Sequence, residues 1–200
     1  MAEVFNTINE RTMVRKFTDK AISEKEKRAI IEAGIRAPTA GGNEQWEFRL
    51  IETPKLKEDL RGLLIDAQKA YFTRMLYEPW TEEAVKNWFG KMGDDIYKAP
   101  FYVAVLVDLR ERAYTIPDVE ELWAQQSAAA AIENMFLAAW ALGIGGCWFG
   151  VPLLMEKEFR ALLGLEEGLK IAAILAFGYP KENPTPKARK KRYEDVVKQL

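Results

Sequence analysis

The densest run of hydrophobic positions lies in residues 121–150 (ELWAQQSAAAAIENMFLAAWALGIGGCWFG). Within residues 127–142 nearly every side chain is apolar or small, and Glu133 and Asn134 are the only strongly polar interruptions. A helix that is apolar on almost all sides is buried. Because a carboxylate in its middle would be costly inside a bilayer, we expect a core helix that ends at Gly143 and does not span a membrane.

The glycines that follow this helix, in GIGGCWFG (143–150), predict a backbone that another group approaches closely. Trp148 and Phe149 come directly after them. A buried helix that leads into a glycine-lined shelf predicts a binding place for a flat ligand.

Three shorter runs predict strands. Residues 101–107 (FYVAVLV) and 171–177 (IAAILAF) are continuously apolar, which is typical of strands buried on both faces. Residues 46–51 (WEFRLI) alternate large apolar and polar side chains and predict a strand with one buried face. Because helical patterns separate these strands, we expect an α+β fold with a mixed central β-sheet covered by helices on both faces.

Capping signals predict further helices before and between the strands. Ser23 and Glu26 have the spacing of a capping box at the start of an apolar helical pattern. Thr53 and Pro54 stand at the N-cap and first positions of the next helix, and Thr81 is expected to cap another.

Residues 71–91 concentrate aromatic side chains: Tyr71, Phe72, Tyr77, Trp80, Trp88 and Phe89. A satellite hydrophobic core is the simpler interpretation of such a cluster. The alternative is a lid or insertion whose rings form part of a substrate pocket, with Tyr71, Trp88 and Phe89 as the candidates.

Residues 181–200 (KENPTPKARKKRYEDVVKQL) change character, from a proline-rich lead through a basic run to a short apolar pattern. The apolar finish predicts an arm that docks on another surface, such as a partner subunit. No repeat or linker divides the chain, so we expect residues 1–200 to form a single domain.

The composition excludes several kinds of chemistry. The chain has no histidine and a single cysteine, Cys147, which excludes histidine-based triads, the usual zinc sites and internal disulfides. A net charge of −1 gives no overall basic footprint for nucleic acid or an anionic membrane surface. We expect no metal and a cytoplasmic protein, since no signal peptide is evident. An enzyme of this composition would rely on a bound organic cofactor, and the alternative is a protein that only binds a ligand.

Two polar segments have two interpretations each. Arg11, Arg15 and Lys16 cluster in an irregular segment, where they are either solvated or grip an anion such as a phosphate. The small residues of 37–45 (APTAGGNEQ) suit either a plain turn or a backbone held against a ligand. A dinucleotide fingerprint is absent, because Trp148 stands where the third glycine of G-x-G-x-x-G would be.

Five segments, in the right order along the whole chain, resemble the FMN-dependent nitroreductase family. They are RTMVRKF (11–17), APTAGGNEQW (37–46), ALGIGGCWFG (141–150), AFGYP (176–180) and KARKKRYEDVV (187–197). The resemblance implies a nitroreductase-like fold with a swapped C-terminal arm. It also implies an intertwined homodimer with FMN at the subunit interface.

The same resemblance assigns the cofactor-binding residues. Arg11 matches the arginine at the FMN phosphate, and Arg15 matches the basic residue near flavin N1 and O2. Lys187 and Arg189 match the C-terminal basic pair at the phosphate, or Lys190 takes that place in a shifted register. Thr12 and Met13 stand beside the phosphate, where the family usually has a second Arg and a Ser. Pro38, Thr39 and Ala40 match the loop from the other subunit, in which Asn43 is shifted by one residue or is replaced functionally by Gly42. Trp148, Phe149 and Gly150 match the shelf whose backbone N–H groups reach N5 and O4.

The activity that the resemblance implies is hydride transfer from NAD(P)H through flavin N5 to a small oxidised acceptor, such as a nitroaromatic or a quinone, in a ping-pong cycle. No catalytic side chain is then expected, because the flavin carries the chemistry. The alternatives are a flavin-binding dimer with little turnover, and a flavin-dependent dehalogenase or dehydrogenase on the same fold.

Overall fold

The computed structural model describes residues 3–186 and 188–199, which form an α+β fold around a four-stranded sheet. The strands are β1 (Trp46–Ile51), β2 (Phe101–Asp108), β3 (Gly145–Phe149) and β4 (Leu169–Gly178), in the order β1-β2-β4-β3. All three strand pairs are antiparallel. The parallel part of the expected mixed sheet is limited, among the described residues, to an isolated bridge between Met13 and Gly146.

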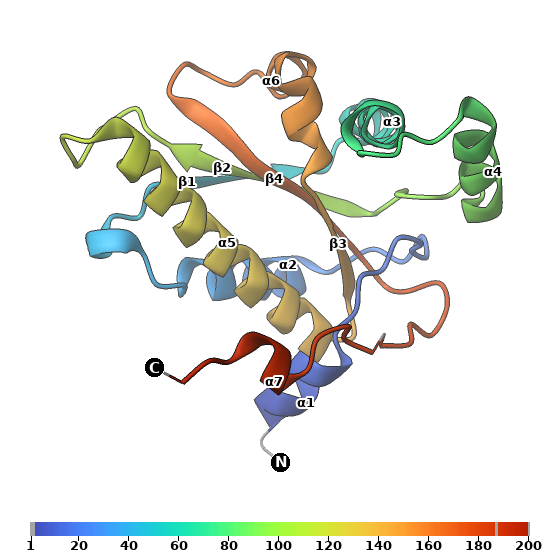
Figure 1. The fold of residues 1–200 in the computed structure, drawn as a ribbon, viewed down its shortest axis with the longest axis horizontal. Helices are drawn as coiled ribbons and strands as arrows, with labels where there is room; N and C mark the ends of the chain where they lie inside the picture. Colours follow the sequence, from blue (N-terminus) through green and yellow to red (C-terminus); the bar gives the residue numbers. More distant parts are fainter. Residues whose placement is uncertain (1–2, 187, 200) are drawn as a thin grey trace.

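The helices surround this sheet (Figure 1). They are α1 (Glu3–Glu10), α2 (Glu24–Ile35), α3 (Pro54–Ala70), α4 (Glu82–Met92), α5 (Pro117–Ala141), α6 (Glu156–Leu163) and α7 (Tyr193–Val196). Short 3-10 or π turns occupy Ala40–Gly42, Tyr71–Met75 and Val151–Met155. No helix within the described ranges combines the length and apolarity that a membrane crossing requires.

The central strand β2 is buried on both faces, as its continuous apolar run predicted. Phe101, Val103 and Val105 pack with α2 and α5, whereas Tyr102 and Ala104 pack with α3 and α6. Helices therefore cover both faces of the sheet, with α2 and α5 on one side and α3 and α6 on the other (Figure 1). This arrangement confirms the expected α+β fold.

The long helix α5 is buried over much of its length, as expected, but it begins at Pro117, well before the apolar stretch. Its first turns carry the acidic side chains of Asp118, Glu120 and Glu121, which suit the positive end of a helix dipole. The apolar pattern alone therefore located the middle of the helix and missed its start.

The glycine-rich segment after α5 is an edge strand, β3, and its close approaches come from the chain itself. A Cβ on Gly145 would lie 2.5 Å from Cγ2 of Val14, and one on Gly146 would lie 2.4 Å from Cε1 of Phe136. The prediction of a closely approached backbone was right. The structure adds that side chains of this chain fill the space at both glycines.

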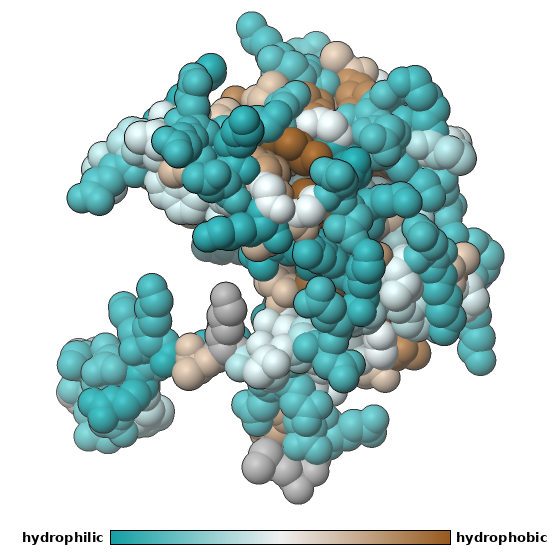
Figure 2. Space-filling view, turned by 90° about the vertical axis from the view of Figure 1, so that its right-hand side faces the viewer, coloured by the Kyte–Doolittle hydropathy of each residue, from teal (hydrophilic) through white to brown (hydrophobic). Residues whose placement is uncertain are grey.

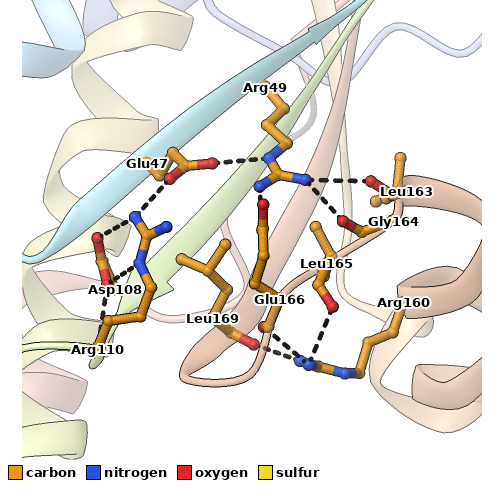
Figure 3. A network of polar contacts seen from close by, with 10 residues as sticks. All are labelled: Glu47, Arg49, Asp108, Arg110, Arg160, Leu163, Gly164, Leu165, Glu166 and Leu169. Atoms are coloured by element: carbon orange, nitrogen blue, oxygen red, sulfur yellow. Dashed lines mark hydrogen bonds and ion pairs between the residues drawn. The ribbon is translucent and has the colours of Figure 1, made fainter.

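One end of the sheet is fastened by an ion-pair network (Figure 3). Arg49 on β1 pairs with Glu47 at 2.7 Å and donates to the Leu163 and Gly164 carbonyls at the end of α6, at 3.1 and 3.2 Å. Arg110, after β2, reaches Glu47 at 2.8 Å. These contacts tie β1, β2 and α6 together at the Asp108 end of β2, away from the β3 glycines, which lie beside the Phe101 end.

The capping box predicted at α2 is present and has a further partner. Ser23 Oγ accepts from the Glu26 N–H at 3.3 Å, and the Glu26 carboxylate accepts from the Ser23 N–H at 2.8 Å. Tyr179, at the end of β4, donates its hydroxyl proton to the same carboxylate at 2.7 Å. The Ser23 hydroxyl also donates to this carboxylate, at 2.6 Å. The hydrogen bonds to the carboxylate, that of the Ser23 hydroxyl first and that of Tyr179 next, lower the pKa of Glu26 from 4.5 to about 2.

Because the pKa of Glu26 is depressed on folding, its contribution to stability is complete above about pH 4.5 and is lost as the pH falls towards about 2. Glu26→Gln keeps a capping side chain but cannot ionise. We expect the difference in free energy of unfolding between the natural protein and this variant to be largest above pH 4.5 and to shrink steadily below it. Urea titrations from pH 7 to pH 2.5 measure this, and parallel pH profiles for the two proteins would contradict it.

Candidate functional site

A cavity of about 450 Å³ lies between the end of α1 and the tail, and we call it the basic cavity. Its lining residues are Ile8, Asn9, Arg11, Thr12, Met13, Arg15, Pro186 and Arg189. Five of the sequence-predicted site residues are therefore brought together, from two segments far apart in the chain. Lys187, the other basic residue predicted there, lies outside the described residues.

Arg11 is the most enclosed cation of the basic cavity. Its side chain is 14% exposed, and its Nε lies 3.2 Å from a Glu133 carboxylate oxygen on α5. That contact is an ion pair without hydrogen-bond geometry, so the buried Nε–H has no hydrogen-bond acceptor among the described residues. The guanidinium also lies 5.8 Å from the centre of the Phe136 ring. A buried donor without an acceptor costs free energy, so an anion in this cavity would stabilise Arg11.

The segment that carries these residues is fastened to the start of β3 and to the residue after β4. The Val14 N–H donates to the Gly146 carbonyl at 2.9 Å, and the Thr18 N–H donates to the Tyr179 carbonyl at 2.8 Å. Val14 is buried in the core, whereas the next residue, Arg15, is exposed. The alternation of an extended segment thus turns Arg15 away from the core and towards the basic cavity.

The edge of β3 that faces away from β4 offers a backbone donor near the basic cavity. Gly146 directs its carbonyl to Val14, away from β4, and the period of two along a strand turns the N–H of Trp148 to the same open side. Phe149 points its backbone groups towards β4, so of these two shelf residues Trp148 is the better placed donor. Trp148 is 37% exposed, and its ring stacks on the Phe136 ring, next to Arg11, with 6.4 Å between the ring centres.

The predicted ligand-lining loop, residues 37–45, contacts an earlier part of α5 than the basic cavity does. The Ala40 N–H donates to Ser127 Oγ at 3.2 Å, and the Asn43 amide donates to the Tyr114 hydroxyl at 2.8 Å. Ser127 precedes Phe136 by about 14 Å along the helix, at about 1.5 Å per residue. None of Pro38, Thr39, Ala40, Gly42 and Asn43 lines the basic cavity of the same chain. The Asn43 side chain is engaged in holding the loop itself.

A buried carboxylate that sequence reasoning missed anchors this loop. Glu120, with no exposed surface, accepts from the Ala113 N–H at 2.6 Å, from Gln45 at 2.9 Å and from Arg112 at 3.1 Å. Burial raises the pKa of Glu120, but these hydrogen bonds outweigh it and hold the pKa below its usual value. No local signal could have revealed this anchor, because its partners come from separate loops.

The aromatic residues of the predicted substrate pocket form a stacked cluster around Phe72. Phe72 stacks on Trp80 at 4.3 Å and meets Trp88 edge-on at 5.1 Å, and Trp88 meets Phe89 at 5.0 Å. Trp88 and Phe89 also pack against the core on the α3 side of the sheet. The satellite-core interpretation therefore fits these two rings, and a substrate-binding role for Tyr71, Trp88 and Phe89 stays a prediction.

A second hollow, of about 500 Å³, lies at the start of α3 and contains several cations. Lys27 pairs with Glu24 at 2.7 Å, Lys57 donates to the Pro100 carbonyl at 3.1 Å, and Arg61 donates to the Ile96 carbonyl at 3.0 Å. These cations already have acceptors in the protein. The basic cavity is therefore the stronger candidate for an anionic ligand.

Comparison with known proteins identifies the family of this chain. The model of the nitroreductase family matches residues 8–179. The chain belongs to the nitroreductase family. The match spans the segment 11–17, the loop 37–45 and strand β3, which carry most of the predicted site.

Individual members of the nitroreductase family support the same conclusion. A protein of Archaeoglobus fulgidus named "Putative NADH dehydrogenase/NAD(P)H nitroreductase" is 28% identical over 184 residues, 91% of this chain and 88% of the relative. A solved nitroreductase with bound FMN from Bacteroides fragilis has a TM-score of 0.69 at 26% identity and covers 100% of both chains. A solved complex with FMN from Desulfovibrio desulfuricans has a TM-score of 0.71 at 28% identity and covers 100% of this chain and 98% of that one.

Proposed function

We propose that this nitroreductase-family chain is an FMN-dependent oxidoreductase that takes electrons from NAD(P)H and passes them to a small oxidised acceptor, such as a nitroaromatic or a quinone. The observation that carries the proposal is Arg11, a nearly buried cation whose Nε–H has no hydrogen-bond acceptor among the described residues, in a cavity that Arg15 and Arg189 also line. Such a donor set fits a dianionic phosphate. The bound FMN of the two solved relatives gives that phosphate a source.

Each residue of the basic cavity has a separate part in this proposal. Arg11 and Arg189 neutralise the phosphate, and the Thr12 hydroxyl adds a neutral donor. Arg15 places a positive charge near the flavin, where it favours the anionic reduced form. Trp148 presents its backbone N–H on the open edge of β3. FMN supplies the hydride-transfer chemistry when it is bound. The residues of this chain bind the cofactor, orient it and tune its preference for the reduced form.

The functional unit that we propose is a homodimer. Val4, Phe5 and Ile8 of α1 are about half exposed, although an apolar helix face normally finds a partner. Tyr193 and Val196 of the tail are also exposed. Figure 2 shows this part of the tail as a hydrophilic lobe that stands clear of the body. A second copy would cover these side chains and bring the loop at 37–45 to the basic cavity of the first.

The proposed activity is tested by anaerobic titration of the FMN-loaded protein with NADH and with NADPH. We expect the visible absorbance of the oxidised flavin to bleach with one of the two donors and to return when a nitroaromatic or a quinone is added. Bound flavin that neither donor reduces would support the alternative of a flavin-binding dimer without turnover. Reduced flavin that no nitro or quinone acceptor reoxidises would point to the dehalogenase or dehydrogenase alternative.

A further inference from the structure

Tyr114, in the segment between β2 and α5, bonds both ends of a short turn in the loop at 37–45. Its hydroxyl oxygen accepts a hydrogen bond from the Asn43 side-chain amide at 2.8 Å. The same hydroxyl donates to the Ala40 carbonyl at 3.3 Å. A phenol can donate one hydrogen bond and accept another, so both contacts form together. The turn Ala40–Gly42 is therefore closed from outside by a single hydroxyl group.

The close fit of Tyr114 on this turn depends on a glycine. Gly41 has a φ of +60°, which favours glycine over residues with a side chain. A Cβ on Gly41 would also collide with the Tyr114 hydroxyl oxygen. The hydroxyl thus occupies the space that a side chain at position 41 would take.

Tyr114 is itself held in place by the first part of α5. Its ring meets the ring of Trp123 edge-on, at an interplanar angle of 81° and with 5.2 Å between the ring centres. The preceding residue, Ala113, donates its N–H to the buried Glu120 carboxylate at 2.6 Å. Tyr114 therefore couples the position of α5 to that of the turn.

The loop needs such a contact because its own side chains do little to fix it. Residues 38–45 are all partly or fully exposed. A segment with few buried side chains opens readily, and its hydrogen bonds decide which shape it keeps. A backbone that lines a ligand must hold its shape before the ligand arrives.

We propose that Tyr114 is a positioning residue that holds the turn at 40–43 in the shape in which it lines the flavin of a second copy of this chain. This inference rests on the proposed function, in which the loop of one copy reaches the basic cavity of the other. Tyr114 acts on FMN through the loop. Its effect therefore falls on the flavin ring and leaves the phosphate end, where Arg11 binds, unchanged.

The first test measures the dissociation constants of FMN and riboflavin for Tyr114→Phe, which keeps the ring against Trp123 and removes only the hydroxyl. We expect both constants to rise about fivefold, the effect of losing about one neutral hydrogen bond. The ratio of the two constants should stay that of the natural protein. The control is Tyr179→Phe, which removes a hydroxyl bonded to Glu26 and should leave both constants within about twofold.

The second test asks whether Tyr114 acts on the site of the other copy. A mixed dimer of one Arg11→Ala chain and one Tyr114→Phe chain is isolated through two different affinity tags. If the loop serves the other copy, both changes fall in one site and the second site is fully natural. We expect about half of the sites to bind FMN as tightly as the natural protein.

FMN titration of the natural protein comes first, because failure to bind FMN would sink the proposed function and this inference together. Three results would remove only the role of Tyr114: unchanged constants in Tyr114→Phe, a loss confined to FMN, or a mixed dimer in which neither site keeps the natural affinity. A merely structural weakening by Tyr114→Phe would give the last of these results, since it would act within its own chain.

Discussion

Arg11→Ala is expected to weaken FMN binding by about tenfold to a hundredfold. Hydrogen bonds to charged groups are worth about 1.5–3 kcal/mol, and about 1.4 kcal/mol is a factor of ten in affinity. Arg11 is the most enclosed cation in the basic cavity, and its Nε–H has no acceptor within residues 3–186 and 188–199. The loss should therefore fall near the upper part of that range. Fluorescence titration with FMN measures it.

The matched control is Arg28→Ala. Arg28 is an exposed arginine on α2 that pairs with Glu32, so its replacement makes the same change in net charge away from the basic cavity. We expect its FMN affinity to stay within about twofold of the natural protein, since exposed charges are strongly screened. Equal losses in the two variants would mean that net charge, and not the position of Arg11, governs binding.

Gly146→Ala is expected to destabilise the protein by about 1–3 kcal/mol, the usual cost of overpacking a core. The added Cβ would lie 2.4 Å from Cε1 of Phe136 and 3.0 Å from Cε1 of Phe177. Both rings are essentially buried between α5 and the sheet, so neither can swing into solvent. Elsewhere in a strand the exchange of glycine for alanine would tend to stabilise, which makes a loss here diagnostic of the contact.

The control for Gly146→Ala is Gly62→Ala on α3, where nothing lies within 4 Å of the added carbon. A helical glycine replaced by alanine should gain about 0.5–1 kcal/mol. Urea denaturation of both variants measures the two free energies of unfolding. A Gly146→Ala protein as stable as the natural one would show that β3 does not pack on Phe136 as described.

The fold was predictable wherever one segment contains its own signal. The continuous apolar runs identified β2 and β4, because strands covered on both faces have no polar side chains to expose. The capping box of Ser23 and Glu26 identified the start of α2. β3 was missed as a strand because Gly145 and Gly146 have low strand propensity, and its conformation comes from pairing with β4.

The candidate site, too, was predictable only for the residues that a local sequence pattern marks. Arg11, Thr12, Met13, Arg15 and Arg189 could be named from the sequence, since they stand in segments with a family pattern, and the structure brings them to one cavity. Glu120 could not be named. Its importance lies in partners from other segments, and a local pattern carries no record of such contacts.

The most direct test of the basic cavity as a phosphate site compares FMN with riboflavin, which is the same flavin without the phosphate. We predict that the protein binds FMN at least about tenfold more tightly than riboflavin, from the charge-assisted bonds of Arg11 and Arg189. In Arg11→Ala that ratio should fall towards one. Equal dissociation constants for FMN and riboflavin in the natural protein would contradict the assignment of the basic cavity.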